Sequence, residues 1–290
     1  MYAASFDYYR PKNLKQAVQL LRKHKDAKIL AGGHSLLPAM KLRVSAPSAL
    51  IDIGRIKGLS GVKASRSSVQ LGAMTTHATI ASSKALRKAC PVLAEAAAQI
   101  GDTQVRNRGT IGGSLAHADP AADFPTVIVA LGGKLVATGS RGQRQISAEK
   151  FFKDFFTTAL KPSEVLTSIQ VPAMKSGMAG VYLKHRHPAS SYAVVGVAAV
   201  VTVKKGVCSK VKLVIGGATP NPVVVSAAEK LLVGQAPSAG AIAEAARSVA
   251  EALGEPLSDS YASGEYRAHL ATVLAERALS AAAAKAKRKK

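Results

Sequence analysis

Apolar and polar residues along the first 175 positions follow helical spacing in some stretches and strand spacing in others. Leu14, Ala17, Val18, Leu20 and Leu21 recur after Pro11 at a spacing that predicts a helix, because side chains three and four residues apart share a helix face. Further helices are predicted at residues 36–42, 78–89, 91–100 and 124–131, with a short helical patch of core phenylalanines at Phe151–Phe156. Strands are predicted at residues 27–30, 49–53, 62–64, 69–73, 134–138, 144–146 and 164–171.

The pattern changes after residues 174–180, a small and flexible stretch that predicts a linker. Valine-rich runs predict three strands, at residues 181–184, 192–203 and 210–216. Helices are predicted at residues 226–232, 239–253 and about 261–284. The last of them places Tyr266, Leu270, Val273, Leu274 and Arg277 on related turns. Strands followed by helices indicate an α+β domain.

Residues 101–125 contain few large apolar side chains, so they do not have the composition of an ordinary core segment. Gly109, Gly112 and Gly113 lie close to the hydroxyls of Thr110 and Ser114. Glycines let a backbone approach a ligand, and successive N–H groups in such a turn bind anions. A surface loop with ordinary turn residues explains the same composition. Both interpretations remain open for this stretch alone.

A second stretch repeats the pattern of a double glycine followed by a hydroxyl. It reads Ala31-Gly32-Gly33-His34-Ser35-Leu36-Leu37-Pro38, and it follows the predicted strand at residues 27–30. Ser35 is a candidate N-cap for the next helix. A strand, a double glycine and a helix start place N–H donors where a phosphate is bound. Two such segments in one chain favour a diphosphate ligand.

Charge and composition limit the partners that the chain is suited to bind. Its 290 residues carry a formal net charge of +23, and five of the last six residues are Lys or Arg. This balance favours acidic partners, such as anionic membrane, acidic subunits or phosphate-bearing ligands, whereas a frayed and solvated helix end also explains the tail. Aromatic residues make up only 4% of the chain, which argues against nucleic-acid binding through base stacking.

Other kinds of chemistry find little support in the sequence. Cys90 and Cys208 form no CxxC or Cys/His cluster, so any iron–sulfur cluster is expected on another chain. Met1–Arg10 lacks a leader-like apolar run and no stretch is long enough to span a bilayer, so we expect a reducing cytoplasm. No GxSxG, GxGxxG or P-loop motif occurs.

The histidines and aspartates leave two readings open. His34, His77 and His117 lie in or beside predicted loops without metal-ligand spacing and are expected to be polar loop residues. Asp119 and Asp123 fit either an acid–base pair or a helix N-terminus with Asp as cap and Pro120 in the first turn. We expect Asp123 to be both structural and ligand-facing.

Several motifs together resemble a known family. They are the run Ala31–Pro38 with Met40-Lys41-Leu42-Arg43, Gly72-Ala73-Met74-Thr75-Thr76-His77, Thr110-Ile111-Gly112-Gly113-Ser114, and Ala118-Asp119-Pro120-Ala121-Ala122-Asp123. The chain resembles the FAD-binding medium subunits of molybdenum hydroxylases, of the aerobic carbon monoxide dehydrogenase type. The same module resembles the flavin domain of xanthine dehydrogenase, and the resemblance covers nearly the whole chain.

The resemblance implies an α+β fold of the vanillyl-alcohol-oxidase type, also called the PCMH type. Residues 1–175 would form the FAD-binding domain, with two α+β lobes at about 1–56 and 57–175. Residues 179–285 would form a C-terminal α+β domain built on a three-stranded antiparallel sheet with helices. Residues 286–290 are a basic tail that belongs to no motif of the family.

The resemblance also implies the residues that bind FAD. Backbone N–H groups of two segments would hold the diphosphate, and Thr76 would lie among the cofactor-binding residues. Asp123 would contact the isoalloxazine edge, and Tyr192 would cover one flavin face, although Tyr192 also fits a core strand position. The two segments consist of Ala31, Gly32, Gly33, His34 and Ser35, and of Thr110, Ile111, Gly112, Gly113 and Ser114.

The implied function is that of an electron-transferring oxidoreductase subunit that holds no metal and no catalytic residue of its own. Electrons would pass from iron–sulfur clusters of a small partner subunit through FAD to a quinone or other acceptor. A large partner subunit would hold the molybdenum cofactor, in a dimer of heterotrimers. The alternatives are a free-standing FAD oxidoreductase and a basic nucleic-acid-binding protein. The tail would meet an anionic membrane, at its inner face, or an acidic partner.

Overall fold

The first lobe of the computed structural model, which describes residues 1–288, is a small parallel sheet with two helices. Its strands lie in the order β1-β3-β2. The helix predicted from Pro11 begins at Leu14, after Asn13, whose side chain accepts the N–H of Gln16 at 3.0 Å. The elements are β1 (Asp7–Tyr9), α1 (Leu14–Lys23), β2 (Lys28–Leu30), α2 (Leu36–Lys41) and β3 (Ala49–Asp52).

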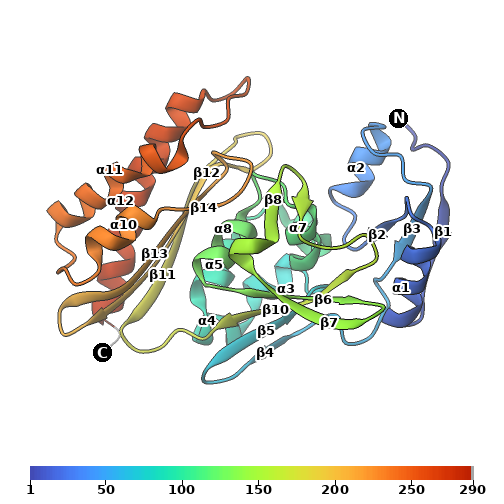
Figure 1. Ribbon diagram of the computed structural model, residues 1–290, viewed down its shortest axis with the longest axis horizontal. Helices are drawn as coiled ribbons and strands as arrows, with labels where there is room; N and C mark the ends of the chain where they lie inside the picture. The colour runs from blue at the N-terminus through green and yellow to red at the C-terminus, as the bar shows by residue number, and fades with distance from the viewer. Residues whose placement is uncertain (289–290) are drawn as a thin grey trace.

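The second lobe is a five-stranded antiparallel sheet covered by helices on one face (Figure 1). The strand order is β4-β5-β10-β6-β7, and Leu71, Ile80, Leu93 and Phe124 are fully buried between the sheet and the helices. The strands are β4 (Val62–Ala64), β5 (Ser68–Gly72), β6 (Lys134–Gly139), β7 (Gly142–Ser147) and β10 (Val165–Pro172). The helices are α3 (His77–Ser82), α4 (Lys84–Ala89), α5 (Pro91–Ala98), α6 (Thr103–Arg108), α7 (Ile111–His117) and α8 (Asp123–Ala130).

Two predictions for this lobe are wrong in detail. The single helix predicted at residues 78–89 is broken at Ser83, whose hydroxyl accepts the N–H of Leu86 and starts a new helix. The patch at Phe151–Phe156 is only partly helical and only partly core. Its elements are α9 (Ala148–Phe151), β8 (Phe152–Asp154) and β9 (Thr157–Thr158). Phe155 and Phe156 are 45% and 56% exposed because they form the turn between the two short strands.

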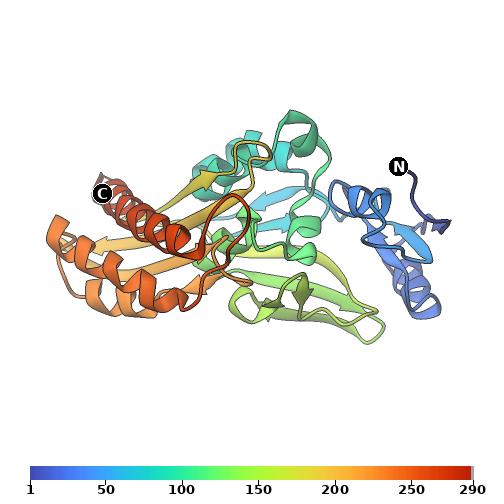
Figure 2. The ribbon, with the colours of Figure 1, turned by 90° about the horizontal axis from the view of Figure 1, so that it is seen from above.

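The C-terminal domain is an antiparallel sheet with helices on its outer face. The predicted sheet has three strands, and the structure adds a fourth, because β14 (Val223–Val224) pairs with Val214 and Ile215 of β13. The other strands are β11 (Met178–Arg186), β12 (Ala193–Lys204) and β13 (Val207–Gly216), so β11 begins inside the predicted linker. Helices α10 (Ser226–Leu232), α11 (Ala239–Leu253) and α12 (Gly264–Arg288) lie on the side away from the first lobe (Figure 2).

The two faces of this sheet bury different partners. The face opposite α10–α12 packs on α5 and α8 of the second lobe, which therefore lie between two sheets (Figure 1). On α12 the buried residues include Arg267, Ala271, Ala275, Ala278 and Leu279. Tyr266, which the sequence places on related turns with Leu270 and Leu274, is 44% exposed. None of the helices within residues 1–288 is long and apolar enough to cross a lipid bilayer.

Candidate functional site

The first glycine segment, residues 31–35, connects the end of β2 to the start of α2. Gly33 has a φ of +79°, a left-handed conformation that favours glycine. A Cβ atom on Gly32 would lie 2.2 Å from the carbonyl oxygen of Arg108, so a side chain at this position would collide with backbone. The segment therefore packs directly against the end of α6, at the entrance to the second glycine segment.

The second glycine segment is not the loop that the sequence predicts. Helix α6 ends at Arg108, and α7 begins after Thr110, whose Oγ1 accepts the N–H of Gly113 at 3.1 Å. A Cβ atom on Gly112 would lie 2.4 Å from the Cβ of Ala73, just after β5. Glycine at this position thus allows α7 to pack closely against the residue after β5. The composition of the segment alone does not distinguish this packing role from a role in ligand binding.

The two segments lie side by side, although they are far apart in the sequence. A Cβ atom on Gly113 would be 3.6 Å from the Cβ of Ala31, and Gly32 approaches the Cα of Gly109. Thr76 lies next to the second segment, because it forms an isolated antiparallel bridge with Thr110. The Oγ1 atom of Thr76 also caps α3 by accepting the N–H of Thr79.

The two segments differ in how their N–H groups are bonded. In the second, the N–H groups of Ile111, Gly112 and Ser114 donate to the carbonyl oxygens of Thr75, Ala73 and Thr110 at 2.8–3.0 Å. In the first, the N–H groups of Gly32, Gly33, His34 and Ser35 donate to no acceptor within residues 1–288. Unbonded N–H donors at the start of a helix are suited to bind a phosphate group. Here they lie beside the backbone of the second segment, which approaches too closely to leave room for a side chain on Gly32.

His77 is the first residue of α3 and is buried, so its prediction as a polar loop residue is wrong. Only 4% of its surface is exposed, and its ring packs against Gly109 and, at a centroid distance of 5.3 Å, against Phe124. Burial, with smaller effects of His34 and Arg106, lowers the pKa of His77 to about 4, so the imidazole is neutral at physiological pH. Its Nδ1 atom has no hydrogen-bond partner among the described residues.

Asp123 links the second lobe to the C-terminal domain. Its carboxylate accepts hydrogen bonds from the Tyr182 hydroxyl at 2.6 Å and from Lys184 Nζ at 2.9–3.0 Å. The side chain of Lys184 is fully buried, and its Nζ also donates to the carbonyl oxygen of Ser191 at 2.7 Å. Asp123 is therefore structural, as predicted. Its contact with a flavin edge stays a prediction, since a carboxylate has further lone pairs to offer.

The environment of Asp123 perturbs three groups. Burial raises the pKa of Asp123 despite the opposing effect of Lys184, and burial lowers the pKa of Lys184. Burial and the Asp123 carboxylate raise the pKa of Tyr182 well above its ordinary value. The sequence analysis missed Tyr182 and Lys184. Their spacing of two on one strand, which places both side chains on one face of the sheet, was the only available signal.

Two further predictions have definite outcomes. Asp123 opens α8 but its cap position is Ala122, while the Asp119 carboxylate accepts the N–H of Ala121 at 2.9 Å, so no aspartate caps this helix. Tyr192 is 42% exposed just before β12 and is not a core strand residue. Its phenol lies close enough to the Ser35 side chain for Ser35 to influence its pKa, so the C-terminal domain reaches the first glycine segment. Partial burial raises the pKa of Tyr192.

Comparison with known proteins matches both parts of the chain to described domains. Residues 4–174 match the model of the FAD binding domain in molybdopterin dehydrogenase, and residues 181–282 match the CO dehydrogenase flavoprotein C-terminal domain. The chain is 36% identical to the 6-hydroxypseudooxynicotine dehydrogenase complex subunit alpha of Paenarthrobacter nicotinovorans, over 96% of this chain and 94% of that protein. It is 37% identical to the carbon monoxide dehydrogenase medium chain of Afipia carboxidovorans, over 99% of this chain and 100% of that protein.

A solved structure agrees with these matches. The carbon monoxide dehydrogenase from Hydrogenophaga pseudoflava that lacks the Mo-pyranopterin moiety of its cofactor superposes with a TM-score of 0.95 at 40% identity. The match covers 98% of this chain and 99% of that one. The family resemblance and the α+β fold expected from the sequence are thereby confirmed. The chain belongs to the family of FAD-binding domains of molybdopterin dehydrogenases, with the CO dehydrogenase flavoprotein C-terminal domain following in the same chain.

Proposed function

We propose that the chain is the FAD-carrying subunit of a heteromeric molybdenum hydroxylase of the carbon monoxide dehydrogenase medium-subunit type. The observation that carries the proposal is the contact between the two glycine segments, one of which presents four unbonded N–H groups. Bound FAD supplies a group that exchanges electrons singly or in pairs, while the protein binds and orients it. Such a subunit would connect iron–sulfur clusters of a partner with a quinone or other acceptor.

The first segment would supply most of the donors to the FAD diphosphate. The N–H groups of Gly32, Gly33, His34 and Ser35 have no internal acceptor, whereas those of Ile111 to Ser114 are already bonded. Thr110, Gly113 and the Ser114 hydroxyl would form the opposite wall, because Gly113 and Ala31 are neighbours. Thr76 would border the same site through its bridge with Thr110.

Two residues would orient the flavin from the C-terminal side of the site. Asp123 would accept a hydrogen bond at the isoalloxazine edge, held in place by Tyr182 and Lys184. Tyr192 would cover one flavin face, since its exposed ring lies next to Ser35. Both assignments place the redox group between the second lobe and the C-terminal domain, which Asp123 already connects.

The partners follow from the same proposal. A small subunit would carry [2Fe-2S] clusters and a large subunit the molybdenum cofactor, in a dimer of heterotrimers located in the cytoplasm. The basic tail at residues 286–290, of which Lys289 and Lys290 lie outside the described residues, would meet an anionic membrane or an acidic partner. The carbon monoxide dehydrogenase medium chain of Afipia carboxidovorans supports the assignment to a multi-subunit complex by its name.

The absorption spectrum of the purified chain tests the proposal. Protein reconstituted with FAD and freed of excess cofactor should retain about one flavin per chain, with bands near 375 and 450 nm typical of an oxidised flavin. Protein that folds but retains no flavin would contradict the proposal. Co-purification of an iron–sulfur chain and a large molybdenum chain would separate a complex subunit from a free-standing oxidoreductase.

A further inference from the structure

Acidic residues are absent from three long stretches of the chain. No Asp or Glu occurs in residues 53–94, 165–228 or 277–290, although Lys and Arg recur throughout them. The net charge of +23 is therefore concentrated in parts of the sequence that lack local counter-charges. Where such stretches meet in the folded chain, the positive charges reinforce one another.

Backbone hydrogen bonds bring these stretches together at one end of the molecule. The N–H groups of Ala173 and Met174 donate to the carbonyl oxygens of Ser67 and Ala89, at 3.0 and 2.8 Å. The N–H of Val203 donates to the carbonyl oxygen of Gly177 at 2.8 Å. The turn after β4, the end of α4, the start of the C-terminal domain and the turn after β12 are thus immediate neighbours.

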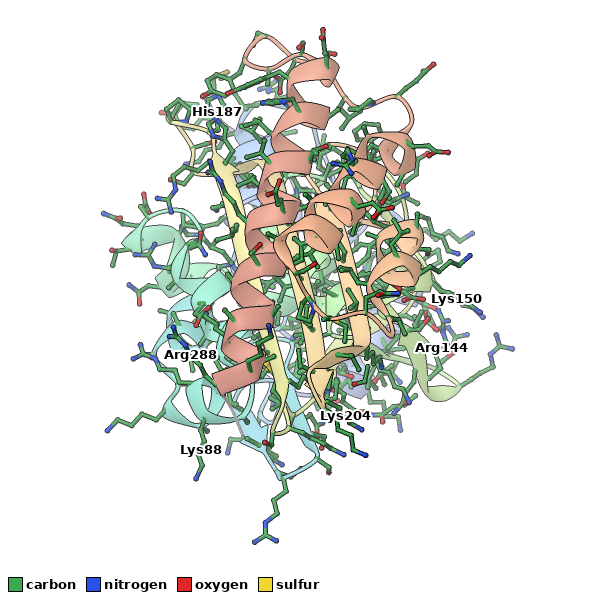
Figure 3. All side chains as sticks on the ribbon, turned by 90° about the vertical axis from the view of Figure 1, so that its left-hand side faces the viewer. Lys88, Arg144, Lys150, His187, Lys204 and Arg288 are labelled. Atoms are coloured by element: carbon green, nitrogen blue, oxygen red, sulfur yellow. The ribbon has the colours of Figure 1, made fainter. Side chains whose placement is uncertain are left out.

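The end of α12 joins the same region. Lys285 forms an ion pair with Glu95 of α5 at 3.4 Å, and Lys287 lies close enough to the buried Cys208 to influence its thiol. We call the resulting surface the basic end, defined by the exposed Arg66, Lys88, Lys175, Lys204, Lys285 and Arg288, of which Glu95 offsets the charge of Lys285. Figure 3 shows Lys88 and Lys204 in the lower part of the molecule and Arg288 at the end of α12 above Lys88.

The basic end faces away from the candidate flavin site. His187, whose N–H donates to the carbonyl oxygen of Tyr192, lies at the opposite edge of the molecule (Figure 3). A planar partner could therefore cover the basic end without touching the glycine segments. Both large domains contribute charges to this surface, so binding does not depend on the tail alone.

The surface lacks the anchors of a protein interface. Among the exposed large hydrophobic side chains of the described chain, Val207 belongs to the segments that form the basic end, and Val233 borders it through its bridge with Cys208; neither is aromatic. Protein interfaces depend on buried aromatic and aliphatic anchors, and single-stranded nucleic acids stack on aromatic rings. Lysines and arginines on exposed turns and helix ends, without such anchors, are instead suited to the charged surface of an anionic bilayer.

We propose that the basic end binds the anionic headgroups of a phospholipid membrane surface. This deepens the membrane contact considered for the tail in the proposed function, and it does not require bound flavin. The charges from Arg66, Lys88, Lys175, Lys204, Lys285 and Arg288 act together, so binding is electrostatic, reversible and weakened by salt. The membrane-bound subunit keeps its glycine segments turned toward solvent or partner chains.

Co-sedimentation with lipid vesicles tests this proposal, using the full chain reconstituted with FAD. Vesicles of neutral phosphatidylcholine are compared with vesicles that contain roughly one third phosphatidylglycerol, at about 0.1 M salt. The variant Lys88→Gln/Lys204→Gln removes one charge from each domain. The matched control, Lys12→Gln/Lys15→Gln, removes two exposed charges beside and on α1 of the first lobe.

We expect binding to the anionic vesicles only, and loss of binding at about 1 M salt, where screening acts over about 3 Å. Each lysine contributes about fivefold near such a surface, so the basic-end variant should bind about 25-fold more weakly and the control nearly as well as the parent. Equal loss in both variants, or equal binding to neutral vesicles, overturns the proposal. So does salt-sensitive binding to an acidic partner subunit or to DNA without vesicle binding. Flavin content, measured in the same samples, reports separately on the proposed function.

Discussion

A carboxylate placed at Ser35 should weaken FAD binding without disturbing the fold. Ser35 precedes α2 and its side chain makes no capping hydrogen bond to that helix. Both Asp and Asn are favourable residues before a helix start, so Ser35→Asp and Ser35→Asn should leave α2 equally stable. Both replacements put a side-chain oxygen near the Tyr192 phenol in place of the Ser35 hydroxyl, so the two variants are closely matched there. Their main difference is one negative charge beside the unbonded N–H groups.

The size of the effect follows from Coulomb's law. A carboxylate about 6 Å from each of two phosphate charges, at an effective dielectric constant of about 20, is repelled by roughly 5 kcal/mol. Ser35 is only partly buried, so solvent screening lowers this value, and we expect ~3 kcal/mol. This corresponds to FAD affinity weaker by about two orders of magnitude in Ser35→Asp than in Ser35→Asn.

The assay is a titration of flavin-free protein with FAD, followed by the quenching of flavin fluorescence at low and at high salt. Thermal unfolding of the flavin-free variants serves as the control for folding and should be the same for both. The difference between the variants should shrink as salt rises. If Ser35→Asp and Ser35→Asn bind FAD within about threefold of each other, the diphosphate does not lie at the first glycine segment, and the reasoning from unbonded donors is refuted.

Three further predictions concern stability, measured by denaturant unfolding. Burial lowers the pKa of His77 from 6.5 to about 4, so between these pH values only the unfolded chain binds a proton at this residue. The free energy of unfolding should therefore fall by ~3 kcal/mol as pH drops through this window. The variant His77→Leu should lack this loss of stability. Lys184→Met should cost ~3–5 kcal/mol because it leaves the buried Asp123 charge without its cation, whereas adding Asp123→Asn should restore much of the loss. Arg267→Lys should cost ~2 kcal/mol, because lysine cannot reproduce the fork with which the buried guanidinium reaches two backbone carbonyl oxygens and Asp259.

The sequence predicted elements well where one face of a segment is buried and the other is solvated. Helices α10 and α11 begin and end at the predicted residues, because alanine and leucine recur at helical spacing up to Gly234 and Gly254. The run of β12 was found because both faces of this sheet are covered, which makes its sequence almost continuously apolar, and the same holds for residues 213–215 of β13. These signals depend only on residues close together in the chain.

The failures occur where distant segments decide the environment of a residue. The helical spacing of α12 does not reveal that Arg267 is buried, because its partners, the carbonyl oxygens of Val194 and Gly217 and the carboxylate of Asp259, lie outside the helix. Phe155 and Phe156 are exposed because they form the turn between β8 and β9, and two phenylalanines in sequence do not indicate such a turn. The pairing of the two glycine segments was correctly anticipated from their similar composition, but the unequal bonding of their N–H groups depends on Ala73 and Thr75.

The connection between α7 and α8 joins the candidate flavin site to the C-terminal domain. The N–H groups of Gly217 and Ala193, at the edge of the C-terminal sheet, donate to the carbonyl oxygens of Pro120 and Ala121 at 3.0 and 3.1 Å. Asp123 follows directly and is held by the same sheet through Lys184. Since α7 carries the second glycine segment, this sheet fixes the end of the helix that forms one wall of the site. The C-terminal domain therefore orders the cofactor-binding lobe through backbone contacts that no spacing in the sequence reveals.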